Sequence, residues 1–303
     1  MPALNLKGNM RFCKIHLLAA VIGFLCPALG ACTTEHPPAL QLNPDILAGK
    51  DAPGLKEYGQ ENLEAGKADI AAKAFAAALK LDAGDDQSRL GLAESYLKLR
   101  ENDQAYGAFR ALMQAGEYKS LVLQGIGLVE LQRGNFEAAE GLLKQAVAED
   151  SGLWRAWNGL GQVYDFQGKW DVSNEAYQKA LEHTAKPYFI YNNMGVSYMA
   201  QKEFKKAAET FQKALRDKPD LDIAKTNYKL ALAMQERYEE ATTESDGSSE
   251  AKALNNAGYV AMMQGKYQEA ERLFIKAIEV NPSFYKTPYY NLQILNQLKQ
   301  KQN

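Results

Sequence analysis

Cysteine is almost absent from this chain, which has three in 303 residues, the last of them Cys32. Residues 33–303 therefore hold no disulfide framework and no thiolate metal site. The three histidines, at 16, 36 and 183, have no spacing typical of metal ligands. Basic residues are not in excess either, because the formal net charge is −2. A chain of this charge lacks the positive surface that nucleic-acid binding requires, so we expect no nucleic-acid partner.

Catalytic motifs are also missing. The segments 167–170 and 264–267 are similar to the end of a phosphate-binding loop, but Trp170 and Tyr267 stand where Ser or Thr must bind the metal ion. We find no Gly-x-Ser-x-Gly elbow, no histidine pair on one helical face and no calcium-binding loop. The sequence therefore predicts a protein that is not an enzyme and that has no cofactor and no bound metal.

The first 31 residues have the order of a secretory signal peptide. An apolar run from Ile15 to Leu25 follows a basic start and precedes a small-residue stretch, 28–31; the basic residues are Lys7, Arg11 and Lys14. The apolar run is too short to span a bilayer comfortably. We predict that residues 1–31 are a signal peptide, with either Met1 or Met10 as the start. Its removal takes away three of the 35 basic residues and none of the 37 acidic ones, which changes the net charge from −2 to −5.

Residues 29–32, Leu-Gly-Ala-Cys, resemble a bacterial lipobox, in which cleavage precedes a cysteine that is then acylated. We expect Cys32 to carry a lipid; the alternative is a plain cleavable signal with an incidental cysteine. Each buried CH2 contributes about 0.8 kcal/mol, so several acyl chains anchor a protein stably. Similarity to Gram-negative lipoproteins implies that Thr33 after the cysteine favours the outer membrane. Residues 32–52, which contain three prolines, are predicted to be a tether.

From residue 53 onward a pattern recurs every 34 residues. A small residue is followed after twelve positions by Ala or Ser, after four more by an aromatic residue or Leu, and after three more usually by Ala. The copies are 59/71/75/78, 93/105/109/112, 127/139/143/146, 161/173/177/180 and 195/207/211/214. This period and pattern are typical of tetratricopeptide repeats, each a pair of packed helices.

The sequence thus predicts an all-α superhelix of six to seven helix pairs over residues 53–287. The repeats lie near 53–85, 86–119, 120–153, 154–187, 188–221, 222–250 and 251–284, and residues 288–303 form a capping helix. The sixth repeat is degenerate, because Lys229 replaces a small residue and residues 242–249 are polar. Residues 242–250 are predicted to be a flexible loop or a kink in the superhelix, and the loop is the simpler interpretation.

Such superhelices bind partners on the concave face, which is lined by the first helix of each repeat. Repeat positions are counted from the first residue of each repeat, such as 188 or 251. Asparagines recur on these helices at positions 5 and 6, and an amide can both donate a hydrogen bond to a peptide backbone and accept one from it. The alternative is that these side chains are only solvated or cap local helices. The candidate groove residues are Arg155, Asn158, Phe166, Phe189, Asn192, Asn193, Met199, Asn227, Asn255, Asn256, Tyr259 and Met262.

Three stretches, 153–161, 191–199 and 254–262, together with the lipobox, resemble the TadD family of tight-adherence (Tad, Flp pilus) lipoproteins. This resemblance implies a pilotin-like scaffold that helps the outer-membrane secretin to assemble or to localise, with a protein partner such as that secretin. Other envelope scaffold lipoproteins and other type IV pilus pilotins share the architecture and stay open as alternatives.

Overall fold

The computed structural model describes residues 49–300 except 114–115, 117, 244–246 and 285. The predicted signal peptide, Cys32 and most of the tether lie outside the described residues. Within them the chain is helical and has no strand, which confirms the predicted all-α class. The helices fall into two compact units, residues 49–185 and residues 186–300, and each is described by itself.

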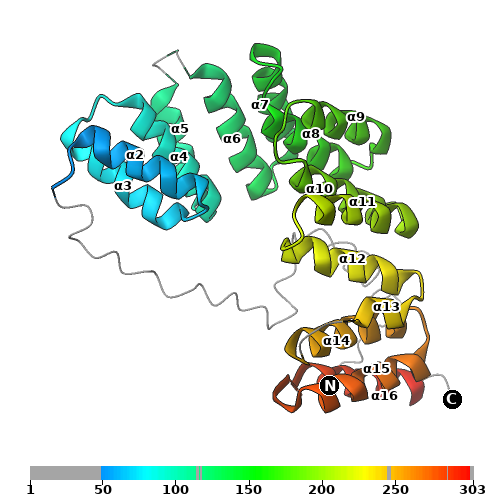
Figure 1. Cartoon of the computed structure of the whole chain (residues 1–303). Coiled ribbons are helices and arrows are strands. Elements are labelled where there is room, and N and C mark those ends of the chain that lie inside the picture. The colour runs from blue at the N-terminus through cyan, green and yellow to red at the C-terminus, as the bar shows by residue number, and fades with distance from the viewer. Residues whose placement is uncertain (1–48, 114–115, 117, 244–246, 285, 301–303) are drawn as a thin grey trace, which may run out of the picture. The chain divides into compact units, whose positions relative to one another are not determined.

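The first unit contains four helix pairs, in which the second helix of each pair also contacts the first helix of the next (Figure 1). Successive first helices lie against one another as well. The pairs are α2 (Ala52–Glu64) with α3 (Ala68–Leu81), α4 (Asp86–Leu99) with α5 (Asn102–Leu112), α6 (Lys119–Arg133) with α7 (Phe136–Glu149), and α8 (Trp154–Phe166) with α9 (Trp170–Glu182).

The second unit contains three further pairs, of which the middle one is incomplete, and a last helix, α16 (Lys286–Gln300), that packs on α15 and α14. This last helix occupies the place predicted for the cap. The pairs are α10 (Pro187–Ala200) with α11 (Phe204–Asp217), α12 (Asp222–Met234) with α13 (Tyr238–Thr242), and α14 (Gly247–Met263) with α15 (Tyr267–Val280); a short 3-10 helix, η2 (Pro282–Phe284), follows.

The 34-residue pattern reflects close packing of glycine against a ring. In the fifth repeat a Cβ added at Gly195 would lie 2.4 Å from Cε1 of Phe211, whose side chain is fully buried. In the first repeat the ring of Phe75 lies against Gly59 of its own repeat and Gly91 of the next. Because a Cβ would overlap the ring at each glycine, these positions require a residue without a side chain.

The turn between the two helices of a repeat uses a left-handed residue at position 15. Glycine supplies it in four repeats, with φ between 70° and 80°, at Gly66, Gly134, Gly168 and Gly265. In the other three repeats the same position has φ of 62° to 64° but is not glycine; the residues are Arg100, Lys202 and Glu236. These three turns therefore carry backbone strain that glycine relieves elsewhere.

Lys202→Gly should stabilise the protein. The left-handed conformation costs a side-chain-bearing residue ~1–2 kcal/mol, and the greater chain entropy of glycine offsets part of that gain, so we expect a net increase of about 0.5–1 kcal/mol. The control is Lys213→Gly, at an exposed position in the interior of α11, which should cost about 1 kcal/mol. Urea unfolding measures both, and a loss of stability in both variants would contradict the strained turn.

The sixth repeat differs from its prediction at the second helix. α13 has five residues and ends at Thr242, whereas the next first helix, α14, already begins at Gly247. Residues 247–250 are therefore helical, and the predicted break over 242–250 is shorter than expected. Glu250 lies in the first turn of α14, where an acidic residue is favoured, and it pairs with Lys276 of α15 at 3.8 Å.

Candidate partner-binding groove

Arg155 lies at the start of α8 and forms an ion pair across the first unit. Its Nη1 donates to Oε2 of Glu94 on α4 at 2.6 Å, and neither side chain is more than about a third exposed. The carboxylate of Glu94 compensates the positive charge of the guanidinium. Arg155 therefore joins first helices from two different repeats, and a partner that bound it would have to compete with Glu94.

Phe166, at the end of α8, is one of the most exposed apolar side chains, with 61% of its surface accessible. Its ring stacks on Phe136, with centroids 3.6 Å apart, just after the inter-helix turn of the third repeat. Asn158 is half-buried in the middle of α8, where its main-chain oxygen accepts a hydrogen bond from Gln162 at 3.5 Å.

In the second unit three of the predicted asparagines form hydrogen bonds with other asparagines of the chain. Nδ2 of Asn227 on α12 donates to Oδ1 of Asn192 on α10 at 3.1 Å. Nδ2 of Asn291 on α16 donates to Oδ1 of Asn255 on α14 at 2.9 Å. Asn192 and Asn255 both occupy repeat position 5, and both are buried. The first pair therefore joins the first helices of two successive repeats, and the second joins α14 to the last helix.

This pairing shows which amides of the predicted asparagine row are hydrogen-bonded within the chain. The position-5 members, Asn192 and Asn255, hold neighbouring repeats together and leave little accessible surface. The position-6 residues differ: Asn256 is exposed, whereas Asn193 and Asn227 are half-buried. Of these amides, the exposed Asn256 is best placed to meet a partner.

Asn255→Ala should destabilise the protein, because it leaves Nδ2 of the buried Asn291 without its acceptor. A buried donor left unpaired costs about 1–3 kcal/mol. Asn256→Ala is the matched control, since the neighbouring side chain is exposed, and it should change stability by less than about 0.5 kcal/mol. The two urea midpoints, measured against wild type, decide the matter; equal midpoints would refute a structural role for Asn255.

The remaining candidates divide between surface and core. Phe189 is 44% exposed and lies against Tyr188, with ring centroids 4.4 Å apart. Tyr259 is half-buried. The structure places Met199 and Met262 in hydrophobic clusters, each about 4% exposed, so their side chains stabilise the repeats and offer almost no surface to a partner.

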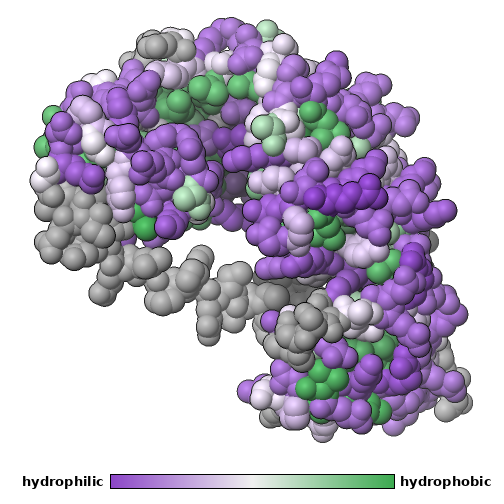
Figure 2. All heavy atoms as spheres, viewed as in Figure 1, coloured by the Kyte–Doolittle hydropathy of each residue, from purple (hydrophilic) through white to green (hydrophobic). Residues whose placement is uncertain are grey.

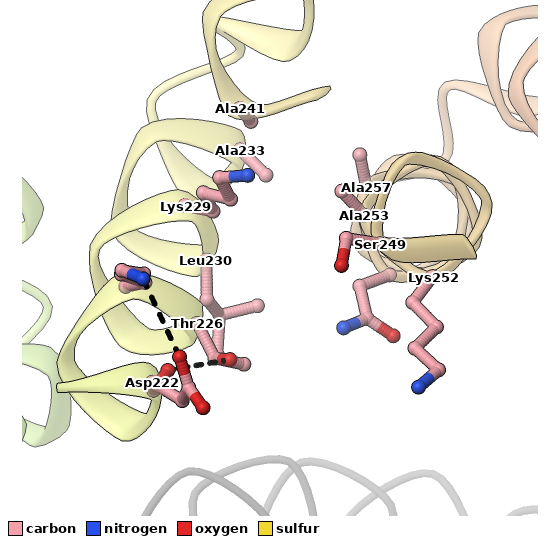
Figure 3. A pocket seen from close by; sticks show the side chains of 12 residues that line it. Asp222, Thr226, Lys229, Leu230, Ala233, Ala241, Ser249, Lys252, Ala253 and Ala257 are labelled. Carbon is pink, nitrogen blue, oxygen red and sulfur yellow. Dashed lines mark hydrogen bonds and ion pairs between the residues drawn. The ribbon is translucent and has the colours of Figure 1, made fainter. Parts of the chain in front are cut away.

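A cleft of about 450 Å³ lies between α12 and α14, and the sequence analysis did not predict it (Figure 3). Lys225 and Lys229 of α12 border one side, and Lys252 of α14 borders the other. Further lining residues are Asp222, Thr226, Leu230, Ala233, Ala241, Ser249, Ala253, Asn256 and Ala257. The signal for it in the sequence was Lys229 at a small-residue position, which by itself indicated only a degenerate repeat.

On the face seen in Figure 2, the described residues form no single broad apolar area. Figure 2 shows a mainly hydrophilic surface on which hydrophobic residues form separate patches. Exposed large apolar side chains lie on several different helices, and they include Leu81, Val172, Ile223 and Ile275. Recognition of a partner on the visible face therefore has to combine polar with apolar contacts.

One buried polar cluster lies in the fourth repeat, where Ser173 and Tyr177 both donate to Asp165, at 2.5 and 2.8 Å. Burial, together with Asp165, raises the pKa of Tyr177 well above its usual value. All three side chains belong to α8 and α9, so the cluster joins the two helices of one repeat. Among the described residues no three His, Cys, Asp or Glu side chains could hold a metal ion together, and no helix is long and apolar enough to cross a membrane.

Comparison with known families decides the identity of these helix pairs. The tetratricopeptide-repeat family matches residues 59–119, 125–188, 188–221 and 251–284. The chain is a tetratricopeptide-repeat (TPR) protein. The matched segments leave out residues 222–250, which form the sixth repeat with its short α13 and one side of the cleft. TPR proteins bind protein partners, and this type of scaffold is typically not enzymatic.

Solved structures agree on the TPR fold. A thermophilic TPR protein of Thermus thermophilus aligns with a TM-score of 0.55 and 20% identity, over 60% of this chain and 98% of its own. Human IFIT1, solved as a dimer with m7Gppp-AAAA, aligns with a TM-score of 0.61 and 18% identity, over 84% of this chain and 64% of its own. A chain of the APC/C hetero-tetramer Cut9–Hcn1 aligns with a TM-score of 0.56 and 14% identity, over 77% of this chain and 49% of its own. No curated protein matches this TPR chain.

Proposed function

We propose that this TPR protein is a pilotin-like, lipid-anchored scaffold on the periplasmic face of the outer membrane. In this role it binds the secretin of a Tad/Flp pilus system and helps it to assemble or to localise. One combination supports the proposal: a lipobox ending at Cys32 precedes a TPR array whose first helices contain the stretches similar to TadD.

Those stretches coincide with α8, α10 and α14, the first helices of three repeats. Within them, Gly161, Gly195 and Gly258 face the ring at position 24 of their own repeats, and Asn192 and Asn255 join neighbouring repeats. What the chain shares with the family therefore includes residues that set the repeat geometry. The lipobox adds the anchor that a pilotin needs to remain beside its secretin.

Deletion of the gene should remove assembled secretin from the outer membrane and abolish pilus export. Because a pilotin acts on assembly, we expect secretin subunits to be made but to accumulate as monomers or in the inner membrane. Fractionation of the envelope followed by unheated gel electrophoresis separates secretin multimers from monomers. Complementation with the wild-type gene is the control.

The alternative function is that of a general envelope scaffold, acting in cell-wall or outer-membrane assembly or for another type IV pilus. The TPR array and the predicted lipid support it equally well. Deletion would then alter cell shape or permeability while Tad secretin multimers remain at wild-type levels. That outcome would replace the secretin proposal with the scaffold alternative.

A further inference from the structure

The cleft between α12 and α14 lies where a complete second helix would pack. In the fifth repeat, position 8 is Gly195 and receives the ring at position 24, Phe211. In the sixth repeat position 8 is Lys229, and α13 ends at Thr242, before position 24 is reached. The cleft is thus bordered by a surface of α12 that other repeats cover with their own second helix.

One residue of this surface has changed with the loss of the helix. Position 8 is glycine or alanine in the other six repeats but Lys229 in the sixth. Position 4 is Lys225 in the sixth repeat, but it is also charged in the second, where it is Arg89 and the second helix α5 is present. Lys229 thus replaces the small residue against which the side chain at position 24 packs in other repeats, so a second helix could not pack here as it does elsewhere.

The lining of the cleft has an excess of positive charge. Its charged residues are three lysines and one carboxylate, that of Asp222, which pairs with Lys225 at 3.4 Å. Nζ of Lys229 donates to the main-chain oxygen of Thr243 at 3.1 Å. Lys252 is exposed on the opposite side of the cleft. A negatively charged occupant would therefore meet more lysines than carboxylates.

Most of the remaining lining residues are apolar. Leu230, Ala233 and Ala241 lie opposite Ala253 and Ala257 across the cleft, and the exposed amide of Asn256 and the hydroxyl of Ser249 lie beside them (Figure 3). A free inorganic anion would use the lysines alone. A peptide segment can use the lysines, the amide and the alanine walls together.

We propose that this cleft binds an acidic segment of the protein partner. Its carboxylates pair with Lys225, Lys229 and Lys252, and small apolar side chains between them contact the alanine walls. The inference rests on the proposed scaffold function, and it adds the chemistry of the partner and the place at which it binds.

The test is binding of a fluorescein-labelled peptide of about twelve residues, in which Glu alternates with Ala and Leu, to the mature acylated protein in nonionic detergent. Fluorescence anisotropy should show saturable binding that weakens as salt is added. Lys225→Glu combined with Lys252→Glu should lower the affinity about tenfold or more, because both substituted side chains are exposed and then repel the probe. A peptide with Gln in place of every Glu should bind no better than that variant.

The matched control is Lys73→Glu combined with Lys205→Glu, which changes the net charge equally at exposed sites outside the cleft. It should bind the acidic probe almost as wild type does. An absence of binding to wild type up to about 1 mM probe, or an equal loss in both double variants, would overturn the proposal. The assay contains no secretin, so normal secretin multimers in the deletion strain would refute the pilotin proposal and leave the cleft result standing.

Discussion

Gly195→Leu should unfold the protein at a clearly lower urea concentration. Even the Cβ of the new side chain would lie 2.4 Å from the ring of Phe211, which is fully buried. Overpacking of this kind costs ~1–3 kcal/mol, and leucine's better helix propensity offsets less than 1 kcal/mol of it. Because each repeat is stabilised by its neighbours, we expect the loss to spread from α10 and α11 to α12.

Gly141→Leu is the matched control for this substitution. Gly141 also lies inside a helix, α7, but a Cβ added there would meet nothing within 4 Å. Leucine at this position should therefore leave stability unchanged or raise it by up to about 1 kcal/mol through helix propensity. If both variants unfold at the wild-type midpoint, the assignment of position 8 as the closest helix contact is wrong.

Cys32→Ser should release the protein from the membrane fraction. Acylation needs the thiol, and the predicted lipid is the anchor on which the proposal depends. Several acyl chains at about 0.8 kcal/mol per buried CH2 make the wild-type attachment effectively permanent. We expect nearly all of the wild type to be recovered with outer membranes and nearly all of the variant to be soluble in the periplasm.

Cys26→Ser provides the control, since this cysteine precedes the proposed cleavage site. It should leave acylation and membrane recovery unchanged. Mass spectrometry of the mature N-terminus identifies the acylated residue directly. A Cys32→Ser protein that still sediments with membranes and resists extraction by salt would disprove the lipid anchor.

The backbone could be predicted from the sequence because it depends on residues that recur. Gly66, Gly134, Gly168 and Gly265 mark the inter-helix turns, and all four have the left-handed conformation that such turns need. The spacing between Gly195 and Phe211 likewise places the two helices of a repeat in register. These contacts are local, lying within one helix pair, so the 34-residue period is enough to predict them.

The candidate groove was harder to predict, because it depends on which side chains of neighbouring repeats meet. Asn192 and Asn227 are 35 residues apart, and nothing in either residue alone shows that they bind each other and not a partner. A spacing of one repeat plus one position, which recurs approximately in Asn255 and Asn291, was the available signal. The cleft depends on where α13 ends, which is Thr242. The polar composition of the following residues indicated that the helical pattern breaks in this region, but not at which residue the helix ends.

Direct binding between this TPR protein and the Tad secretin is the most direct test of the proposed function. The mature acylated protein should be purified from outer membranes in mild detergent, as wild type, Gly141→Leu and Gly195→Leu, and the secretin that co-purifies should be quantified. We expect secretin to be recovered with the wild type and with Gly141→Leu, and to be lost with Gly195→Leu. Absence of secretin from the wild-type preparation, while secretin multimers still reach the outer membrane, would contradict the proposal.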